Sequence, residues 1–184
     1  MFRILIFFFI LNIFNSAQAS IKDKIILKLK ETNSLGFNFN QTIDEKNENG
    51  RCIVKYPKKI YCEYNNLNKK IIVSNGVSLV IKNRNNGISY IYPLKKTPLE
   101  FLLDKKYLIK KIKNLKFKII DNKFINFTIF ENKNEINIFF DNKTFNLIGW
   151  QTEDIYQNLT ITFISSVKRN QIVNDDTFIL PKID

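Results

Sequence analysis

The chain has 184 residues with a net charge of +12, and it contains two cysteines and no histidine. This length suits one domain with a substantial core. The absence of histidine excludes Ser-His-Asp and Cys-His catalytic arrangements and the usual zinc sites. The lysines are spread along the sequence, and Lys, Asn, Ile and Phe all have A/T-rich codons, so we expect no nucleic-acid partner despite the charge.

The first nineteen residues have the pattern of an export signal. Arg3 precedes an apolar stretch at 4–14, and Ala17-Gln18-Ala19 fits an A-x-A cleavage site. This stretch of eleven residues is too short for a bilayer core that requires about 20. We predict that residues 1–19 are a cleaved signal peptide and that 20–184 form one domain; a retained N-terminal anchor is the alternative. Ser20 stands where a lipoprotein would have cysteine.

A helix and a strand are predicted next. Ile21, Ile25 and Leu29 recur on one helical face, with Ser20 as N-cap and an end near residues 32–33. From residue 35 to 41 apolar residues alternate with polar ones, which indicates a β-strand.

Residues 50–64 predict a hairpin that turns at 56–59 and has one cysteine on each arm. Cys52 lies opposite Cys62 or one step diagonal to it, close enough for a disulfide. An exported chain enters an oxidising compartment, where disulfides persist. We predict a Cys52–Cys62 bridge; two buried free thiols are the alternative.

Further along the chain, residues 70–83 form a second hairpin that turns at Asn75-Gly76, and residues 88–93 a strand. Thr97 as N-cap, Pro98 and Glu100 predict a capping box, followed by a short helix and a second turn at 107–112. The remaining predicted strands are 115–121, 124–131, 135–141, 145–154, 157–165 and 176–180. About ten antiparallel strands with two helical inserts indicate a barrel or a strongly curved sheet.

One apolar stripe along these strands is either an ordinary core or the wall of a ligand cavity. The candidate cavity residues are Leu35, Phe37, Phe39, Val54, Tyr56, Ile60, Tyr64, Leu79 and Ile81. No catalytic residue, metal site or cofactor is expected. Ser165-Ser166-Val167-Lys168 lacks the companion motifs of S-x-x-K enzymes, and Glu153 and Asp154 would point to opposite faces of a strand.

The order of short motifs resembles the LolA family of lipoprotein carriers. The matching stretches are Phe39-Asn40-Gln41, residues 54–57, 72–79 and 98–103, Phe140-Asp141, Gly149-Trp150, Asp154 and residues 178–181. The resemblance implies an α+β, mainly β fold: an unclosed antiparallel β-barrel of about ten to eleven strands with short helices forming a lid over an apolar cavity. It implies that the hairpin at 50–64 walls an acyl-chain cavity. The expected lid residues are Ile21, Ile25, Leu29, Leu99, Leu102 and Leu103.

The resemblance also implies a function. It implies a periplasmic monomer that receives acylated lipoproteins from an inner-membrane lipoprotein-releasing ABC transporter and delivers them to an outer-membrane lipoprotein acceptor. Tyr56 departs from the pattern, because well-studied members carry at this position an arginine that helps to close the lid. The alternatives are a related periplasmic lipid-binding or lipoprotein-sensing protein and a basic binder of surface polyanions.

Overall fold

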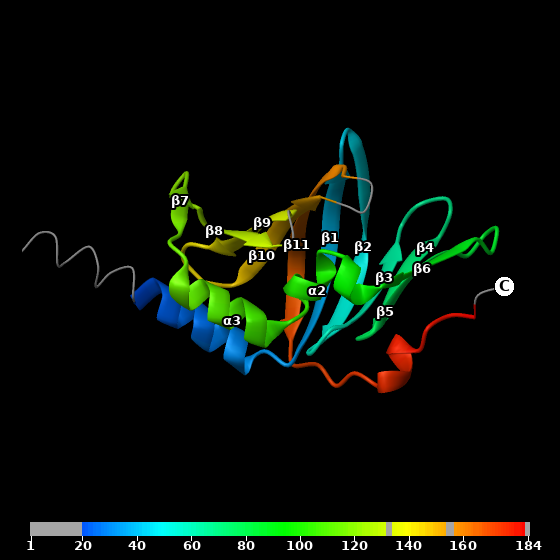
Figure 1. Ribbon diagram of the computed structural model, residues 1–184, viewed down its shortest axis with the longest axis horizontal. Helices are drawn as coiled ribbons and strands as arrows, with labels where there is room; N and C mark the ends of the chain where they lie inside the picture. Colours follow the sequence, from blue (N-terminus) through cyan, green and yellow to red (C-terminus); the bar gives the residue numbers. More distant parts are fainter. Residues whose placement is uncertain (1–19, 132–133, 154–156, 183–184) are drawn as a thin grey trace, which may run out of the picture.

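The computed structural model describes residues 20–131, 134–153 and 157–182 (Figure 1). The predicted signal peptide at 1–19 and Asp154 lie outside these residues. The eleven strands are β1 (Ser34–Ile43), β2 (Lys46–Lys55), β3 (Lys59–Tyr64), β4 (Lys70–Asn75), β5 (Ser78–Asn83), β6 (Ser89–Pro93), β7 (Lys118–Ile120), β8 (Phe124–Glu131), β9 (Asn134–Asp141), β10 (Leu147–Glu153) and β11 (Leu159–Arg169). The helical segments are an N-terminal helix, described over 20–31, η1 (Leu94–Lys96), α2 (Leu99–Leu102), α3 (Lys105–Asn114) and η2 (Asp175–Phe178).

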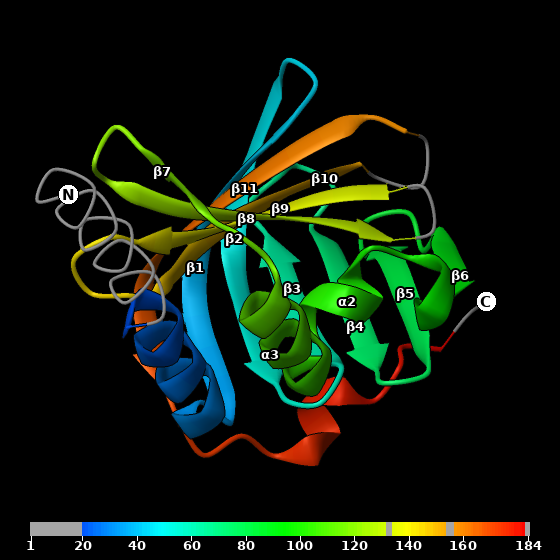
Figure 2. The same ribbon diagram turned by 60° about the vertical axis from the view of Figure 1, so that its left-hand side comes forward.

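The strands form one antiparallel sheet in the order β6-β5-β4-β3-β2-β1-β11-β10-β9-β8-β7. The order ends at β6 and β7, so the sheet is an unclosed barrel. Figure 2 shows the sheet curving around α2, α3 and the N-terminal helix. The predicted mainly β, unclosed architecture with short helices is confirmed.

The predicted β4–β5 turn is confirmed, and a glycine in β2 allows two aromatic rings to pack closely. The β4–β5 turn falls at Asn75-Gly76, where Gly76 has a positive φ of 99° and the Asn75 side chain accepts from the N–H of Val77 at 2.9 Å. Gly50 of β2 pairs with Phe39 on one side and Tyr64 on the other. A Cβ at Gly50 would lie 2.0 Å from a backbone oxygen and 2.9 Å from the Phe39 ring, so glycine lets the two rings approach to a centroid distance of 4.8 Å.

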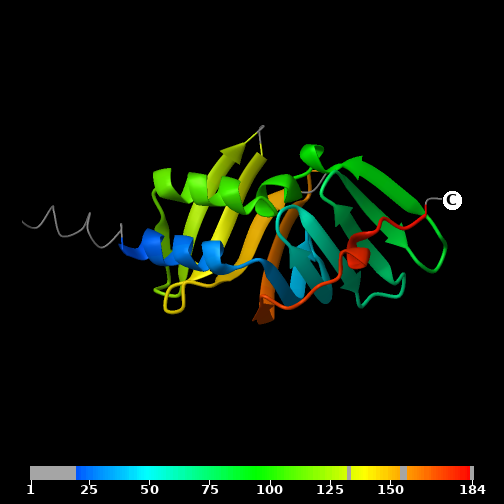
Figure 3. The ribbon, with the colours of Figure 1, turned by 90° about the horizontal axis from the view of Figure 1, so that it is seen from below.

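Two strand predictions are wrong in their extent. The expected strand at 176–180 is the short helix η2, because Asn174 accepts from the N–H of Asp176 and caps a helical turn. The expected strand at 115–121 is reduced to the three residues of β7, because only Lys118 to Ile120 pair with β8. The C-terminal segment instead runs along the outer face of the sheet (Figure 3). Lys55 and Lys59 hold it there through Asp175, at 2.8 and 3.1 Å.

The buried side chains form two clusters. The helical cluster joins the N-terminal helix, α2 and α3 to β8 and β9, and it consists of Ile25, Ile26, Leu29, Leu102, Leu108, Ile112, Ile125, Phe127, Ile129, Ile136, Ile138 and Phe140. The barrel cluster lies mainly on β1 to β3, and it consists of Leu35, Phe37, Phe39, Cys52, Val54, Ile60, Cys62, Tyr64, Leu79, Leu94, Leu103 and Ile164. Leu99, Leu147 and Trp150 pack against both clusters.

Candidate functional site

A cavity of about 360 Å³ opens on the concave side of the sheet, beside the barrel cluster. This volume is at the lower end of the range of small-ligand pockets, roughly 300–1,000 Å³. Six of the nine candidate cavity residues line it: Phe37, Phe39, Ile60, Tyr64, Leu79 and Ile81. Leu35 and Val54 lie in the barrel cluster and Tyr56 packs against it, and these three residues do not reach the cavity surface.

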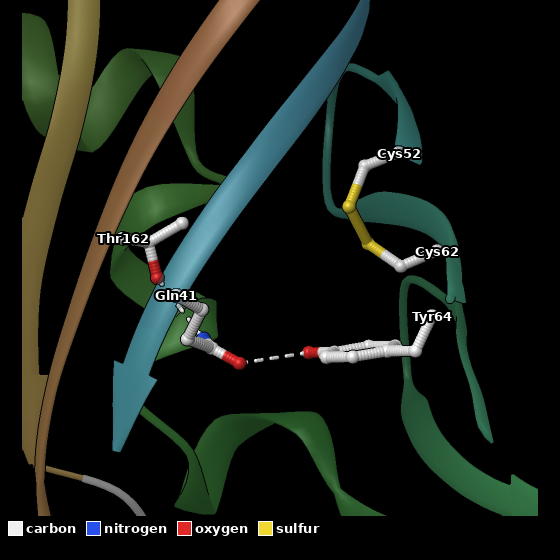
Figure 4. Close-up of a disulfide and its surroundings, with 5 residues drawn as sticks. All are labelled: Gln41, Cys52, Cys62, Tyr64 and Thr162. Carbon is white, nitrogen blue, oxygen red and sulfur yellow. Dashed lines mark hydrogen bonds between the residues drawn. A yellow bond between two sulfur atoms is a disulfide. The ribbon is translucent and has the colours of Figure 1, made fainter. Parts of the chain in front are cut away.

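The predicted disulfide forms part of the cavity wall. Cys52 and Cys62 are direct partners in the β2–β3 register, with Cα atoms 4.1 Å apart, and a bond joins their sulfur atoms (Figure 4). Direct pairing in an antiparallel ladder brings the Cβ atoms within bridging range. The bond therefore ties the two strands together beneath the cavity.

A chain of polar groups crosses the cavity lining from β3 to β11. The Tyr64 hydroxyl donates to Gln41 Oε1 at 3.1 Å, and Gln41 Nε2 donates to Thr162 Oγ1 at 3.0 Å (Figure 4). Burial raises the pKa of Tyr64, so this phenol remains a donor at neutral pH. Thr152 and Thr160 continue the polar surface, since they face each other across β10 and β11 and both line the cavity.

Sequence reasoning missed this polar surface. Gln41 follows Phe37 and Phe39 at a spacing of two, so the alternation that identified the aromatic residues also placed Gln41 on the same face. The threonines gave no comparable signal, because threonine is common in strands for its β-branched shape alone.

Lys70 at the cavity rim has a local counter-charge. Its ammonium group forms an ion pair with Glu48 and lies 3.9 Å from the centre of the Tyr64 ring. The positive charge is therefore balanced beside the cavity.

The short helix α2 lies between the cavity and the core. The predicted capping box is wrong: Pro98 is the N-cap residue, and the Thr97 hydroxyl donates back to the Leu94 carbonyl at 2.9 Å. The side chains of the three expected lid residues diverge: Leu99 lines the cavity, Leu102 belongs to the helical cluster and Leu103 to the barrel cluster.

The β2–β3 turn holds α2 in place through Lys58. The Lys58 N–H donates to the Leu103 carbonyl at 2.9 Å, and its ammonium group lies 2.5 Å from Glu100 and 3.6 Å from Asp104. The hydrogen bond to Glu100 raises the pKa of Lys58. Glu100, expected to cap its own helix, instead ties that helix to the hairpin.

Tyr56, at the position where the family's arginine was expected, is half-buried beside α3. Its N–H donates to the Asn33 carbonyl at 2.9 Å, and the Lys105 ammonium group lies 5.7 Å from its ring centre. Burial raises the pKa of Tyr56 to about 12. The same ammonium group donates to the Thr32 carbonyl at 2.7 Å, so Lys105 connects α3, the end of the N-terminal helix and the hairpin.

The N-terminal helix covers a different part of the sheet from α2. Ile25 and Leu29 are buried in the helical cluster, and Ile21 packs against it. The helix lies beside α3 (Figure 3), and Lys22 Nζ donates to the Lys113 carbonyl at 3.3 Å. None of its three expected lid residues lines the cavity. No helix in the described part of the chain is long and apolar enough to cross a bilayer.

Comparison with solved structures identifies similar folds at low sequence identity. An uncharacterized conserved protein from Thermus thermophilus is 11% identical over 91% of this chain and 95% of that one, with a TM-score of 0.53. A LolA superfamily protein from Nitrosomonas europaea is 11% identical over 88% and 97%, with a TM-score of 0.45. LprF from Mycobacterium bovis is 12% identical over 87% and 97%, with a TM-score of 0.48.

Comparison of the sequence with protein families gives the assignment. No curated protein matches the sequence. The family model described as outer membrane lipoprotein carrier protein LolA matches residues 30–181, which include all eleven strands. The chain therefore belongs to the LolA family.

Proposed function

We propose that the protein carries acylated lipoproteins between membranes by shielding their acyl chains in the barrel cavity, without catalysing any bond change. The observation that carries this proposal is the cavity itself, whose wall includes Phe37, Phe39, Ile60, Leu79 and Ile81. An acyl chain exposed to water costs about 0.8 kcal/mol per CH₂. A carrier that crosses an aqueous compartment needs such a shield.

The proposed route runs through the periplasm. As a monomer, the protein would take lipoproteins from an inner-membrane lipoprotein-releasing ABC transporter and deliver them to an outer-membrane acceptor. Membership of a family described as outer membrane lipoprotein carrier protein supports this route, and the disulfide suits an oxidising compartment. Residues 1–19 would direct export and be removed. Intact mass of the periplasmic form should therefore correspond to a chain that begins at Ser20; a mass that includes residues 1–19 contradicts the export step.

The carrier function can be tested with spheroplasts whose lipoproteins have radiolabelled acyl chains. The measured quantity is the labelled lipoprotein released from them. The purified protein should bring labelled, intact lipoprotein into the soluble fraction. Release of cleaved lipid or peptide instead would overturn the proposal.

A matched pair of variants on one hairpin locates the site. Ile81 of β5 lines the cavity, and its partner strand β6 carries Ile91, which is 51% exposed. Ile81→Gln should reduce release several-fold because it places an amide in the acyl path, whereas Ile91→Gln should leave release unchanged. Equal effects of the two substitutions would show that the cavity is not the binding site.

Salt separates this function from polyanion binding. Acyl-chain transfer should persist or strengthen in ~0.5 M salt, because salt does not weaken burial of apolar surface. Binding to a polyanion should collapse in the same buffer.

A further inference from the structure

We propose that the polar end of the cavity is a binding subsite for the neutral carbonyl group of an acyl ester, with Thr152 and Thr162 as donors. This inference rests on the proposed acyl-carrier function and adds the position and chemistry of the ligand's polar end. Along β1, the cavity-facing residues are Phe37 and Phe39, then Gln41 and last Ile43, and Gln41 pairs with Thr162 of β11. An elongated ligand therefore meets an apolar region and then a polar one.

Two threonine side chains of β10 and β11 contribute hydroxyl groups to the cavity lining. Thr162 and Thr152 are only 2% and 7% exposed, yet both side chains line the cavity. Thr162 Oγ1 already accepts from Gln41, so its own proton is available to donate. Among the described residues, the Thr162 hydroxyl has no acceptor for its proton and the Thr152 side chain makes no hydrogen bond. A ligand acceptor placed beside these two hydroxyls can therefore gain hydrogen bonds from them.

The surrounding charges select a neutral acceptor. Lys70 is the one cationic residue among the described residues that line the cavity, and a carboxylate ligand would need its charge. The positive charge of Lys70 is paired with Glu48 and stacked on Tyr64, so it offers little compensation. An ester carbonyl accepts hydrogen bonds without adding charge. The chemistry therefore fits the ester-linked part of an acylated molecule better than a free fatty acid.

The chain contains its own reporter for a binding test. Its single tryptophan, Trp150, lines the cavity and pairs with Thr162 in the sheet. Titration of the mature protein with methyl laurate, dodecane and laurate at pH 8, followed by Trp150 fluorescence, compares an ester, a bare chain and a carboxylate. We expect wild-type protein to bind methyl laurate more tightly than laurate.

Isosteric variants test the donors. Thr152→Val and Thr162→Val together should reduce the preference for methyl laurate over dodecane by about 10- to 100-fold, since each neutral hydrogen bond contributes ~3- to 10-fold in affinity. Thr42→Val is the matched control, because Thr42 lies on β1 and its side chain bonds to Asn47 outside the cavity. It should leave the preference unchanged.

The outcomes separate the two proposals. If dodecane and methyl laurate both bind but the double variant keeps the wild-type preference, the subsite is refuted and the carrier function stands. If neither ligand binds wild-type protein, both proposals fail. If the double variant does not fold, the wild-type comparison decides: laurate binding as tightly as methyl laurate refutes the subsite.

Discussion

Replacing Leu102 with alanine should destabilise the fold strongly and leave acyl binding to the folded fraction nearly unchanged. Leu102 is 9% exposed and packs in the helical cluster with residues of the N-terminal helix and α3. The substitution removes about three carbon groups at ~0.8 kcal/mol each, and the remaining void raises the total to about 3 kcal/mol. For a domain of this size the melting temperature should fall by about 6–12 °C.

Leu99 on the same helix is the matched comparison. It is half-buried and lines the cavity, so Leu99→Ala should cost only about 1 kcal/mol and weaken acyl binding several-fold. Thermal unfolding gives the first quantity, and Trp150 fluorescence titration with an acyl ester gives the second. If Leu102→Ala costs less than ~1 kcal/mol but changes uptake, then Leu102 is a movable lid residue and the reasoning from burial is refuted.

Three further predictions concern the hairpin and its contacts. Removing the Cys52–Cys62 bond by a double alanine substitution should lower the free energy of unfolding by about 2–3 kcal/mol, as expected for a loop with a sequence separation of 10. Urea titration measures this loss, and no loss in non-reduced protein would contradict the bond. Lys58→Met should cost about 1–2 kcal/mol because it leaves Glu100 without its partner. Hydrogen exchange should then increase in α2, and unchanged exchange would mean that the turn does not hold this helix. The pKa of Tyr56 is raised to about 12 in the folded protein, whereas in the unfolded chain it is ~10. The stability that the protonated Tyr56 phenol contributes is therefore complete below pH ~10 and is lost as the pH rises towards 12, because the unfolded chain ionises first. Denaturant titrations at pH 9 to 12 should show a smaller alkaline loss for Tyr56→Phe than for wild type; equal losses would exclude this phenol as a cause.

Local sequence patterns predicted most of the strands because the physics of strands and turns is local. The alternation from residue 35 to 41 and the Asn75-Gly76 turn correspond to β1 and the β4–β5 hairpin. The cysteine pairing followed from the same logic, since the turn at 56–59 determines which residues face each other. The apolar stripe of the 50–64 hairpin put Ile60 and Tyr64 on one face, and the family resemblance implied that this face walls a cavity, which both residues line.

The remaining features depend on contacts between distant segments. Thr97 and Glu100 have the spacing of a capping box, but Lys58 competes for the Glu100 carboxylate from a turn 42 residues away. The lysines are scattered in sequence, yet the N-terminal helix and the segment 104–118 together carry eleven lysines against three carboxylates. Packing of the two helices brings these lysines close together, and this proximity cannot be predicted from a local sequence pattern.

Trp150, Leu147 and Leu99 pack against both buried clusters, and Trp150 and Leu99 also line the cavity. A ligand bound in the cavity would contact Leu99 and Trp150, which connect the two clusters. Loading should therefore make the whole molecule, helices included, more resistant to heat and protease, by an amount that grows with ligand concentration. Under the proposed carrier function, an acceptor that removes the ligand must overcome this added stability, and the unloaded protein is the less stable of the two forms.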